Sequence, residues 1–375
     1  MIVVKEIKKK KDIKKFVMFP IKMYKKEKRY IPCIVGDEMK LLNKKKNPAY
    51  EYCETKLFLA YKDKKIVGRI CGLMNHSYNK KKGLNQIRFC RFDVIDDIEV
   101  TKALFRAVID WADERGIKEM IGPIGFSDLD KEGMLVEGFE EMSNSLTLYN
   151  YPYYVKHLEE LGFRKDADWV EYQVFTPKEM NERINRVAEI IKKRKGYKVV
   201  KLKSAKDVKY YARKAFSLIN EAFAPLYGVV ELNPKQIEEA IKQFVPIVAM
   251  TNYEYCYIIN DDKDNTLGFG VLAPSLNNAL KKSNGKMFPF GIFRMLRDLK
   301  KSEILDMYIL AVKPEYHNLG VNTLILCEGI KSAIKNGVKF AETGPELELN
   351  NRVQDQWKEF EVRQHRRRRS WIINF

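Results

Sequence analysis

One stretch of this 375-residue sequence constrains the fold most, because it changes from a strand pattern to a helix pattern within one tight turn. It spans residues 310–322 and reads LAVKPEYHNLGVN. The helix continues with apolar residues at helical spacing, namely Leu324, Ile325, Cys327, Ile330 and Ile334. A helix N-terminus presents unpaired N–H groups and the positive end of the helix dipole, which together can hold a pyrophosphate. Gly320 would let the backbone approach that phosphate closely.

This stretch resembles the signature of the GNAT acetyltransferase superfamily, which is Val-x-Pro-x-Tyr followed by Arg/Gln-x-x-Gly-x-Gly/Ala at a helix start. Gly320 matches the signature, whereas His317 replaces the usual Arg or Gln and Asn322 replaces the final Gly or Ala. The resemblance implies that acetyl-CoA or another acyl-CoA is the co-substrate. It also implies that the strand backbone at Leu310 and Val312 pairs with pantetheine. The amides that would cradle the pyrophosphate are those of His317, Asn318, Leu319, Gly320, Val321, Asn322 and Thr323.

The same resemblance implies catalytic residues. Asp306 lies six residues before Val312, where some GNAT enzymes carry a general base that removes a proton from the ammonium substrate. The alternative for Asp306 is a polar strand residue that faces solvent or Arg297. Many members place a proton-donating Tyr seven residues after an Asn, but here Trp357 stands at that position, and an indole cannot act as the acid. Tyr308 is the substitute that we consider.

The order of predicted elements occurs twice, although the two halves show no evident sequence identity. The first half contains a hairpin, a strand and a helix, predicted at 56–61 with 65–73, 86–94 and 100–115. The second half repeats this order at 255–260 with 266–273, 303–312 and 318–336. We therefore expect an α/β (α+β) fold of two tandem GNAT-like domains, each a mixed, mostly antiparallel sheet flanked by helices.

We expect an N-terminal domain at 1–176, a helical linker at 177–195 and a C-terminal domain at 196–375 that carries the cofactor loop. Residues 1–50 are predicted to be basic and irregular after a strand near Ile2–Ile7, with Pro20, Pro32 and Pro48 as breakers.

The first half lacks the phosphate-binding glycine loop. Between Phe92 and Lys102 it has acidic residues in the run Asp93-Val94-Ile95-Asp96-Asp97, which would repel a pyrophosphate. The N-terminal domain is therefore expected to have lost the cofactor site and to supply substrate-binding surface.

The charge of the chain is strongly positive and uneven. Lys and Arg total 69 against 50 Asp and Glu, and the first 46 residues hold sixteen basic and five acidic residues. One interpretation is an acidic partner such as RNA, a membrane or a phosphate-rich cofactor. The other is an ordinary solvated surface, which we prefer because the Lys runs lack the aromatic interleaving of an RNA-binding sheet. For the second basic patch, Arg366–Arg369, we favour pairing with Glu346 and Glu348 over binding an acidic substrate.

The remaining composition points to the cytoplasm. No apolar run approaches the ~18 residues of a transmembrane helix, and Met1–Lys5 lacks the apolar core of a signal peptide. The six cysteines form no CxxC pair or Cys/His cluster, so we expect reduced thiols and no metal site.

Three functions are compatible with these features. The first is an acyl-CoA-dependent N-acyltransferase that acts by direct, general-base-assisted transfer on an unidentified small-molecule or peptide amine. The second is a catalytically inactive GNAT-like CoA-binding, ligand-binding or scaffold protein, which the departures at His317, Asn322 and Trp357 favour. The third is an aminoacyl-tRNA-dependent transferase, whose basic N-terminal segment would hold the tRNA. We expect no membrane partner, and nucleic acid only in the third case; a homodimer is left open.

Overall fold

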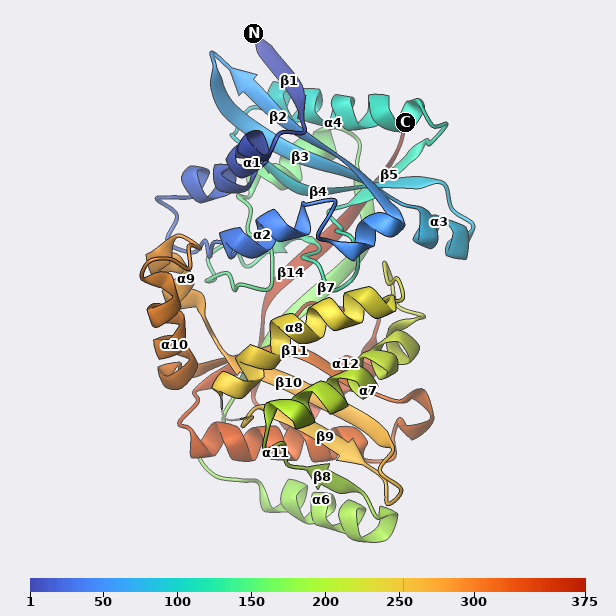
Figure 1. The fold of residues 1–375 in the computed structure, drawn as a ribbon, viewed down its shortest axis with the longest axis vertical. Helices are drawn as coiled ribbons and strands as arrows, with labels where there is room; N and C mark the ends of the chain where they lie inside the picture. The colour runs from blue at the N-terminus through green and yellow to red at the C-terminus, as the bar shows by residue number, and fades with distance from the viewer. Residues whose placement is uncertain (252) are drawn as a thin grey trace.

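The computed structural model describes residues 1–251 and 253–375, and a single large sheet runs through it (Figure 1). The strands are β1 (Ile2–Ile7), β2 (Cys53–Lys62), β3 (Lys65–Asn75), β4 (Gln86–Val94), β5 (Glu119–Gly122), β6 (Met134–Glu137), β7 (Arg164–Phe175), β8 (Lys198–Val200), β9 (Cys256–Asn260), β10 (Thr266–Pro274), β11 (Ile304–Val312), β12 (Phe340–Glu342), β13 (Glu346–Leu347) and β14 (Val362–Asn374). They pair in the order β1-β2-β3-β4-β5-β14-β7-β12-β11-β10-β9-β8, and β6 and β13 attach to β14 and β7.

Helices cover both faces of this sheet. They are α1 (Lys10–Met23), α2 (Val35–Leu41), α3 (His76–Lys82), α4 (Ile98–Asp113), α5 (Tyr153–Glu160), α6 (Glu182–Lys195), α7 (Ala205–Phe223), α8 (Pro234–Met250), α9 (Asn277–Ser283), α10 (Gly291–Lys301), α11 (Val321–Lys335) and α12 (Asn351–Asp355), with 3-10 turns η1 (Pro48–Glu51), η2 (Pro314–Tyr316) and η3 (Gln356–Glu359). In the second half, α7 and α8 pack on one face of the sheet, and α6 and α11 pack on the other. The predicted mixed α/β class is confirmed.

Strands from the two halves cross over at the centre of the sheet. The last strand, β14, lies between β5 and β7, and β7 lies between β14 and β12. The two are antiparallel over most of their length, from Val362 opposite Val174 to Ile372 opposite Arg164. The domain boundaries near residues 176 and 196 stay a prediction, and the structure adds that β14 completes the sheet of the first half.

The arginine run is part of this central strand. The register places Arg366 opposite Glu171 and Arg369 opposite Asp168, and both pairs form ion pairs, at 2.6 and 2.8 Å. Arg367 contacts Glu348, so the preference for pairing within the chain is confirmed for that carboxylate. It is wrong for Glu346, which accepts from Trp357 instead.

The first fifty residues are more regular than the sequence indicated, and the prediction of an irregular segment was wrong. Helices α1 and α2 and the turn η1 lie there, and Pro20 sits inside α1. A proline in a helix leaves the carbonyl four residues earlier without its partner. Here that carbonyl belongs to Phe16, and Arg69 donates to it at 2.9 Å. A side chain from another element therefore makes the helix compatible with Pro20.

The described residues contain neither a membrane-spanning helix nor a cluster of metal ligands. No helix in residues 1–251 or 253–375 combines the length and the apolar character needed to cross a bilayer. The same residues contain no group of three or more His, Cys, Asp or Glu side chains arranged to hold a metal ion.

Candidate active site

The candidate site begins where β11 separates from β12. These parallel strands pair over only three residues, ending at Asp306 opposite Glu342. Beyond that point β11 pairs with β10 on its other side as far as Val312, while the chain after β12 turns into β13, which pairs with β7. One edge of β11 from Met307 onward therefore faces a gap in the sheet. An extended ligand can pair with such a strand edge.

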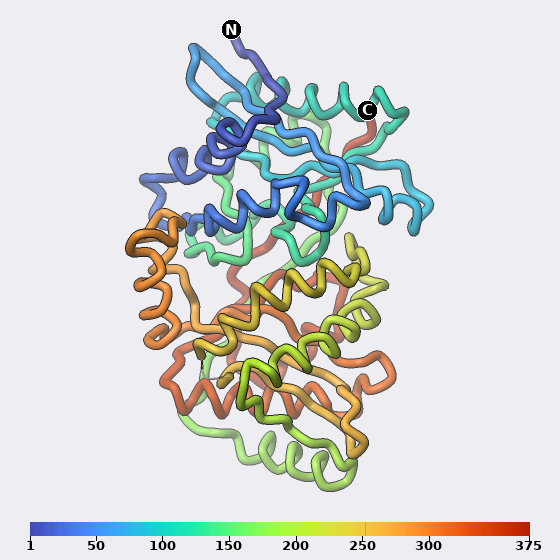
Figure 2. The backbone as a smooth tube through the Cα atoms, viewed as in Figure 1, coloured from blue at the N-terminus to red at the C-terminus, as the bar shows by residue number. Residues whose placement is uncertain are grey.

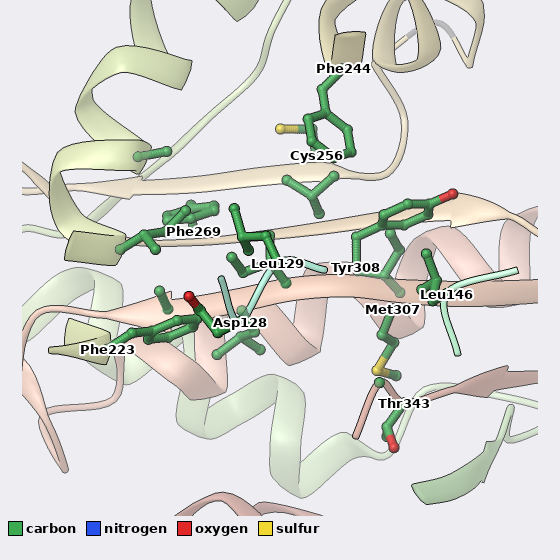
Figure 3. A pocket seen from close by; sticks show the side chains of 18 of the residues that line it. Asp128, Leu129, Leu146, Phe223, Phe244, Cys256, Phe269, Met307, Tyr308 and Thr343 are labelled. Atoms are coloured by element: carbon green, nitrogen blue, oxygen red, sulfur yellow. The ribbon is translucent and has the colours of Figure 1, made fainter. Parts of the chain in front are cut away.

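Tyr308 lies at an irregularity of β11. Val271 pairs with Ile309 and Leu272 pairs with Met307, so Tyr308 is an extra residue, a β-bulge. The bulge places the Tyr308 ring near Phe244 of α8, with 6.1 Å between ring centroids (Figure 3). Tyr308 lines the cavity described below, and burial raises the pKa of its hydroxyl well above the usual value. The phenol therefore stays protonated and can donate a hydrogen bond.

Asp306 is buried, with 1% of its surface exposed, and does not line the cavity. The alternative of a solvent-facing residue is thus wrong. Neither carboxylate oxygen has a hydrogen-bond partner among the residues described. Burial raises the pKa of Asp306 to about 7, and the neighbouring Glu342 adds to the shift, while Ser275 and Arg366 oppose it. A carboxyl group with such a pKa can take up a proton near neutral pH.

The N-terminus of α11 lies at the same cavity. Gly320 occupies the position before the helix, with φ of 89°, and no side chain caps the first turn. The first-turn amides of Val321, Asn322 and Thr323 have no carbonyl within the helix to bond to. Most of the predicted cofactor residues line the cavity: Leu310, Val312, His317, Asn318, Leu319, Gly320, Asn322 and Thr323. Val321 does not, because its side chain is fully buried in the core.

The requirement for glycine at 320 has a reason that the sequence did not show. A Cβ atom at this position would lie 2.5 Å from Cδ1 of Ile191 in α6. Such a distance is too short for two carbons, and the positive φ also disfavours other residues. The missing side chain thus makes room for Ile191, and the close approach of a phosphate to the Gly320 backbone stays a prediction.

A basic side chain that sequence reasoning missed lies beside this loop. Arg352 of α12 contacts Nδ1 of His317, while Nε2 of His317 lies 3.1 Å from the carbonyl oxygen of Val312. Arg352 also lines the cavity. His317 therefore links the end of β11 to α12 and positions a guanidinium group near the uncapped helix. Because 35 residues separate the two, no local motif indicated this contact.

Glu346 is a second residue that the sequence did not indicate. The indole of Trp357 donates to both carboxylate oxygens of Glu346, at 3.1 Å. Burial raises the pKa of Glu346 to about 8 despite this hydrogen bond. Glu346 lines the cavity and is largely protonated at neutral pH, so it is a candidate proton donor next to Trp357, which stands where many GNAT members carry the Tyr.

Tyr308, Glu346, Arg352 and most of the loop before α11 line one cavity of about 2330 Å³. Figure 3 shows another part of its wall, around Tyr308. Ligand pockets usually measure about 300–1,000 Å³, so this cavity is unusually large. Much of its wall is apolar and comes from α7, α8, β10 and β11, including Phe216, Ile219, Phe223, Phe244, Phe269 and Ile309. The first half contributes Asp128, Leu129 and Leu146, so the cavity lies between the two halves.

The loop before β6 brings two more acidic groups to this cavity. Burial raises the pKa of Asp128 to about 6 and that of Glu132 well above its ordinary value. One carboxylate oxygen of Glu132 is buried without a hydrogen-bond partner among the residues described. Neighbouring Asp130 differs, because it pairs with Arg91 at 3.0 Å. Asp128 is therefore an acidic group from the first half that is available to a cationic ligand, whereas its raised pKa keeps Glu132 protonated.

Comparison with known sequences finds distant relatives. No family model matches the chain. It is 25% identical over 334 residues to Protein YghO of Escherichia coli, covering 86% of this chain and 82% of that protein. It is also 25% identical over 298 residues to a bacterial ceramide synthase of Caulobacter vibrioides, covering 77% of this chain and 74% of the synthase.

Comparison with solved structures shows the fold. A tandem GNAT protein from the clavulanic acid biosynthesis pathway aligns over 100% of this chain and 98% of its own, with a TM-score of 0.54 and 11% identity. A GCN5-related glucosamine N-acetyltransferase region of a fungal multi-domain enzyme gives the same TM-score and identity, covering 38% of that longer chain. The predicted tandem GNAT resemblance is confirmed at the level of the fold.

Proposed function

We propose that this chain, whose fold is that of tandem GNAT proteins, transfers a long acyl group from CoA to an amine. One observation carries the proposal: the unpaired edge of β11, the uncapped N-terminus of α11 and a large apolar cavity adjoin one another. The strand edge suits the amides of pantetheine, and the helix N-terminus suits the pyrophosphate.

The size and polarity of the cavity favour a long acyl chain over an acetyl group. Each buried methylene contributes about 0.8 kcal/mol to binding, so an apolar cavity favours ligands with many methylenes. The relative named as a ceramide synthase supports this choice, because a ceramide is the amide of a fatty acid and a long-chain amino alcohol. We therefore propose a lipid-like amine as the acceptor.

The transfer forms a C–N bond and breaks the C–S bond of the thioester. The amine must first lose a proton, for which Asp306 is the candidate base with a pKa of about 7. The departing thiolate must gain a proton, and Glu346 and Tyr308 both line the cavity in protonated form. Asp128 lines the cavity from the first half and can attract the cationic amine.

The test is calorimetry with free CoA, acetyl-CoA and palmitoyl-CoA, followed by turnover with a long-chain amino alcohol. We expect palmitoyl-CoA to bind at least about tenfold more tightly than acetyl-CoA and to yield the amide. Equal affinity for the two thioesters would refute the long-chain assignment. No binding of any of the three ligands at millimolar concentration would refute the whole proposal.

A non-catalytic ligand-binding protein is the second candidate. It is favoured by the position of Asp306 outside the cavity lining and by the contact of His317 with the carbonyl of Val312. It predicts that acyl-CoA binds and that no amide forms with any amine tested. Amide formation that is lost in Asp306→Asn would exclude it.

A further inference from the structure

Three phenylalanines are exposed where α9 connects to α10. Phe288, Phe290 and Phe293 have 77%, 67% and 68% of their surface exposed, and they lie within six residues of one another. Single exposed apolar side chains are common on proteins, whereas a cluster of large ones marks an interaction surface. The α9–α10 hairpin, residues 277–301, projects at the edge of the molecule (Figure 1).

The same hairpin is strongly basic. It contains seven Lys and Arg residues and one acidic residue, Asp298. The carboxylate of Asp298 accepts from the amide of Ala279 at 2.7 Å and so links the two helices. The exposed basic side chains are Lys282, Lys286, Arg294, Arg297, Lys300 and Lys301. Aromatic and basic groups together are typical of helices that lie at the interface of a bilayer.

The basic N-terminal segment extends this surface. The amide of Val35 donates to the carbonyl of Gly285 at 2.9 Å, and Lys281 donates to the carbonyl of Lys28. Ile31 shares a buried cluster with Leu280 and other residues of the hairpin. These contacts place the segment that follows α1 beside α9 (Figure 2). Its exposed basic residues there are Lys25, Lys26, Lys28 and Arg29.

The inner face of α10 adjoins the cavity. Met295 and Leu299 are buried, and both line the cavity together with Ile292 and Leu296. One short helix therefore presents aromatic and basic side chains outward and an apolar wall of the cavity inward. A lipid surface against α10 would lie next to the cavity.

We infer that the α9–α10 hairpin docks on a bilayer that contains anionic lipids. Phe288, Phe290 and Phe293 insert between the lipid chains, and the surrounding Lys and Arg side chains contact lipid phosphates. This surface contact needs no spanning helix, and it departs from the expectation of no membrane partner. The inference does not depend on acyl transfer, although such a contact would deliver lipid substrates to the cavity.

The first test measures sedimentation of the full chain with vesicles. We expect the wild type to bind phosphatidylcholine vesicles with about 30% phosphatidylglycerol at least about tenfold more tightly than phosphatidylcholine alone, and to release at about 0.5 M NaCl. The triple variant Phe288→Ser, Phe290→Ser, Phe293→Ser should lose at least about tenfold in affinity. The matched control replaces three exposed apolar residues elsewhere, Val3→Ser, Leu84→Ser and Leu349→Ser, and should bind like the wild type.

The second test uses tryptophan fluorescence. The four native tryptophans, at positions 111, 169, 357 and 371, are all at most 4% exposed. Phe290→Trp therefore adds the one solvent-exposed indole among the described residues. We expect its emission to shift to shorter wavelength on anionic vesicles and to be quenched by lipids brominated in the acyl chain.

Three results would overturn the inference. The first is equal binding of the wild type and the triple Ser variant to anionic vesicles. The second is an unchanged emission of Phe290→Trp on those vesicles. The third is a dimer that the triple variant converts to a monomer without any vesicle binding, because the surface would then be a protein interface. The affinity for CoA is also measured on the triple variant. Unchanged CoA binding shows that a failure of vesicle binding concerns this surface alone and leaves the proposed acyl transfer intact.

Discussion

The N-termini of α4 and α11 occupy equivalent places in the two halves, each following the strand that separates from its parallel neighbour. Helix α4 begins after Asp97, whose carboxylate accepts from the amide of Glu99 at 3.1 Å and pairs with Lys62. Helix α11 begins after Gly320 and has no side-chain cap. The first helix therefore carries its own anion, whereas the second leaves its amides available to a ligand.

The gap beside β4 is filled by contacts within the chain, whereas the gap beside β11 is not. In the first half, Phe89 accepts from the amide of Ile124 at 3.0 Å. Val94 accepts from Tyr153 and donates to the hydroxyl of Tyr154, at 2.6 and 2.8 Å. In the second half, the corresponding gap adjoins the large cavity. The gap beside β4 is thus closed by one backbone amide and two tyrosine hydroxyls that bond to the strand backbone, whereas the gap beside β11 is open to the cavity.

The largest effect is expected from a negative charge placed at the uncapped N-terminus of α11. Leu319→Glu would place a carboxylate beside the first turn of α11, where it would act as Asp97 does on α4. Repulsion of a pyrophosphate by a nearby charge costs about 3 kcal/mol or more in a partly buried site, so the Kd for CoA should rise at least about 100-fold. Calorimetry measures it, with Leu319→Gln as the uncharged control of equal size. An unchanged Kd in Leu319→Glu would show that this helix end binds no anion.

The next effect concerns Asp306. Removing a general base lowers turnover by about 10²–10⁴, so Asp306→Asn should lose amide formation while the Kd for CoA stays the same. A base acts when deprotonated, and the pKa of Asp306 is about 7, so wild-type turnover should rise between pH 6 and 8 and then level. Tyr308→Phe retains the base, so its turnover should show the same rise with pH as the wild type even where loss of the phenol lowers the rate. A pH profile that is identical in Asp306→Asn would exclude Asp306 as the base.

The raised pKa of Asp306 also predicts an effect on stability. The folded state favours the protonated acid, so the contribution of Asp306 to stability is greatest at low pH and falls as the pH rises from the ordinary pKa of 3.8 to about 7. That shift in pKa corresponds to a decrease in the free energy of unfolding on the order of 4 kcal/mol. Asp306→Asn does not titrate, so its Tm should exceed that of the wild type at pH 8 and the difference should shrink toward pH 5. A difference in Tm between the two proteins that stays constant from pH 5 to pH 8 would show that Asp306 does not ionise in a buried site.

A smaller effect should separate short from long acyl chains. Ala222 lies in α7 and lines the cavity. Ala222→Phe would fill part of the apolar space, and overfilling a packed site typically costs 1–3 kcal/mol. We expect kcat/KM for palmitoyl-CoA to fall about tenfold, whereas acetyl-CoA should be unaffected and serves as the internal control. Equal losses for both thioesters would place the acyl chain elsewhere.

The features predictable from sequence were those encoded in neighbouring residues. The hairpin β2–β3, the strand β4 and the helix α11 follow from local periodicity and turn residues, as does the uncapped end at Gly320. Arg352, Glu346 and Asp128 reach the site only through tertiary contacts, so no spacing pattern indicated them. The same holds for α1, because Pro20 is tolerated only through the hydrogen bond from distant Arg69.

The smallest expected effect tests the capped N-terminus of α4. Asp97→Ala removes the cap of α4, and loss of an N-cap costs about 1 kcal/mol, so the free energy of unfolding should fall by that amount. Asp97→Asn is the control: it keeps a capping oxygen and loses only the exposed ion pair with Lys62, so it should stay within about 0.5 kcal/mol of the wild type. Both variants should bind CoA as the wild type does, because α4 already satisfies its own amides. Weaker CoA binding in Asp97→Ala would mean that the first half also contributes an anion site, and the contrast between the two helices would no longer explain why only one of them is open.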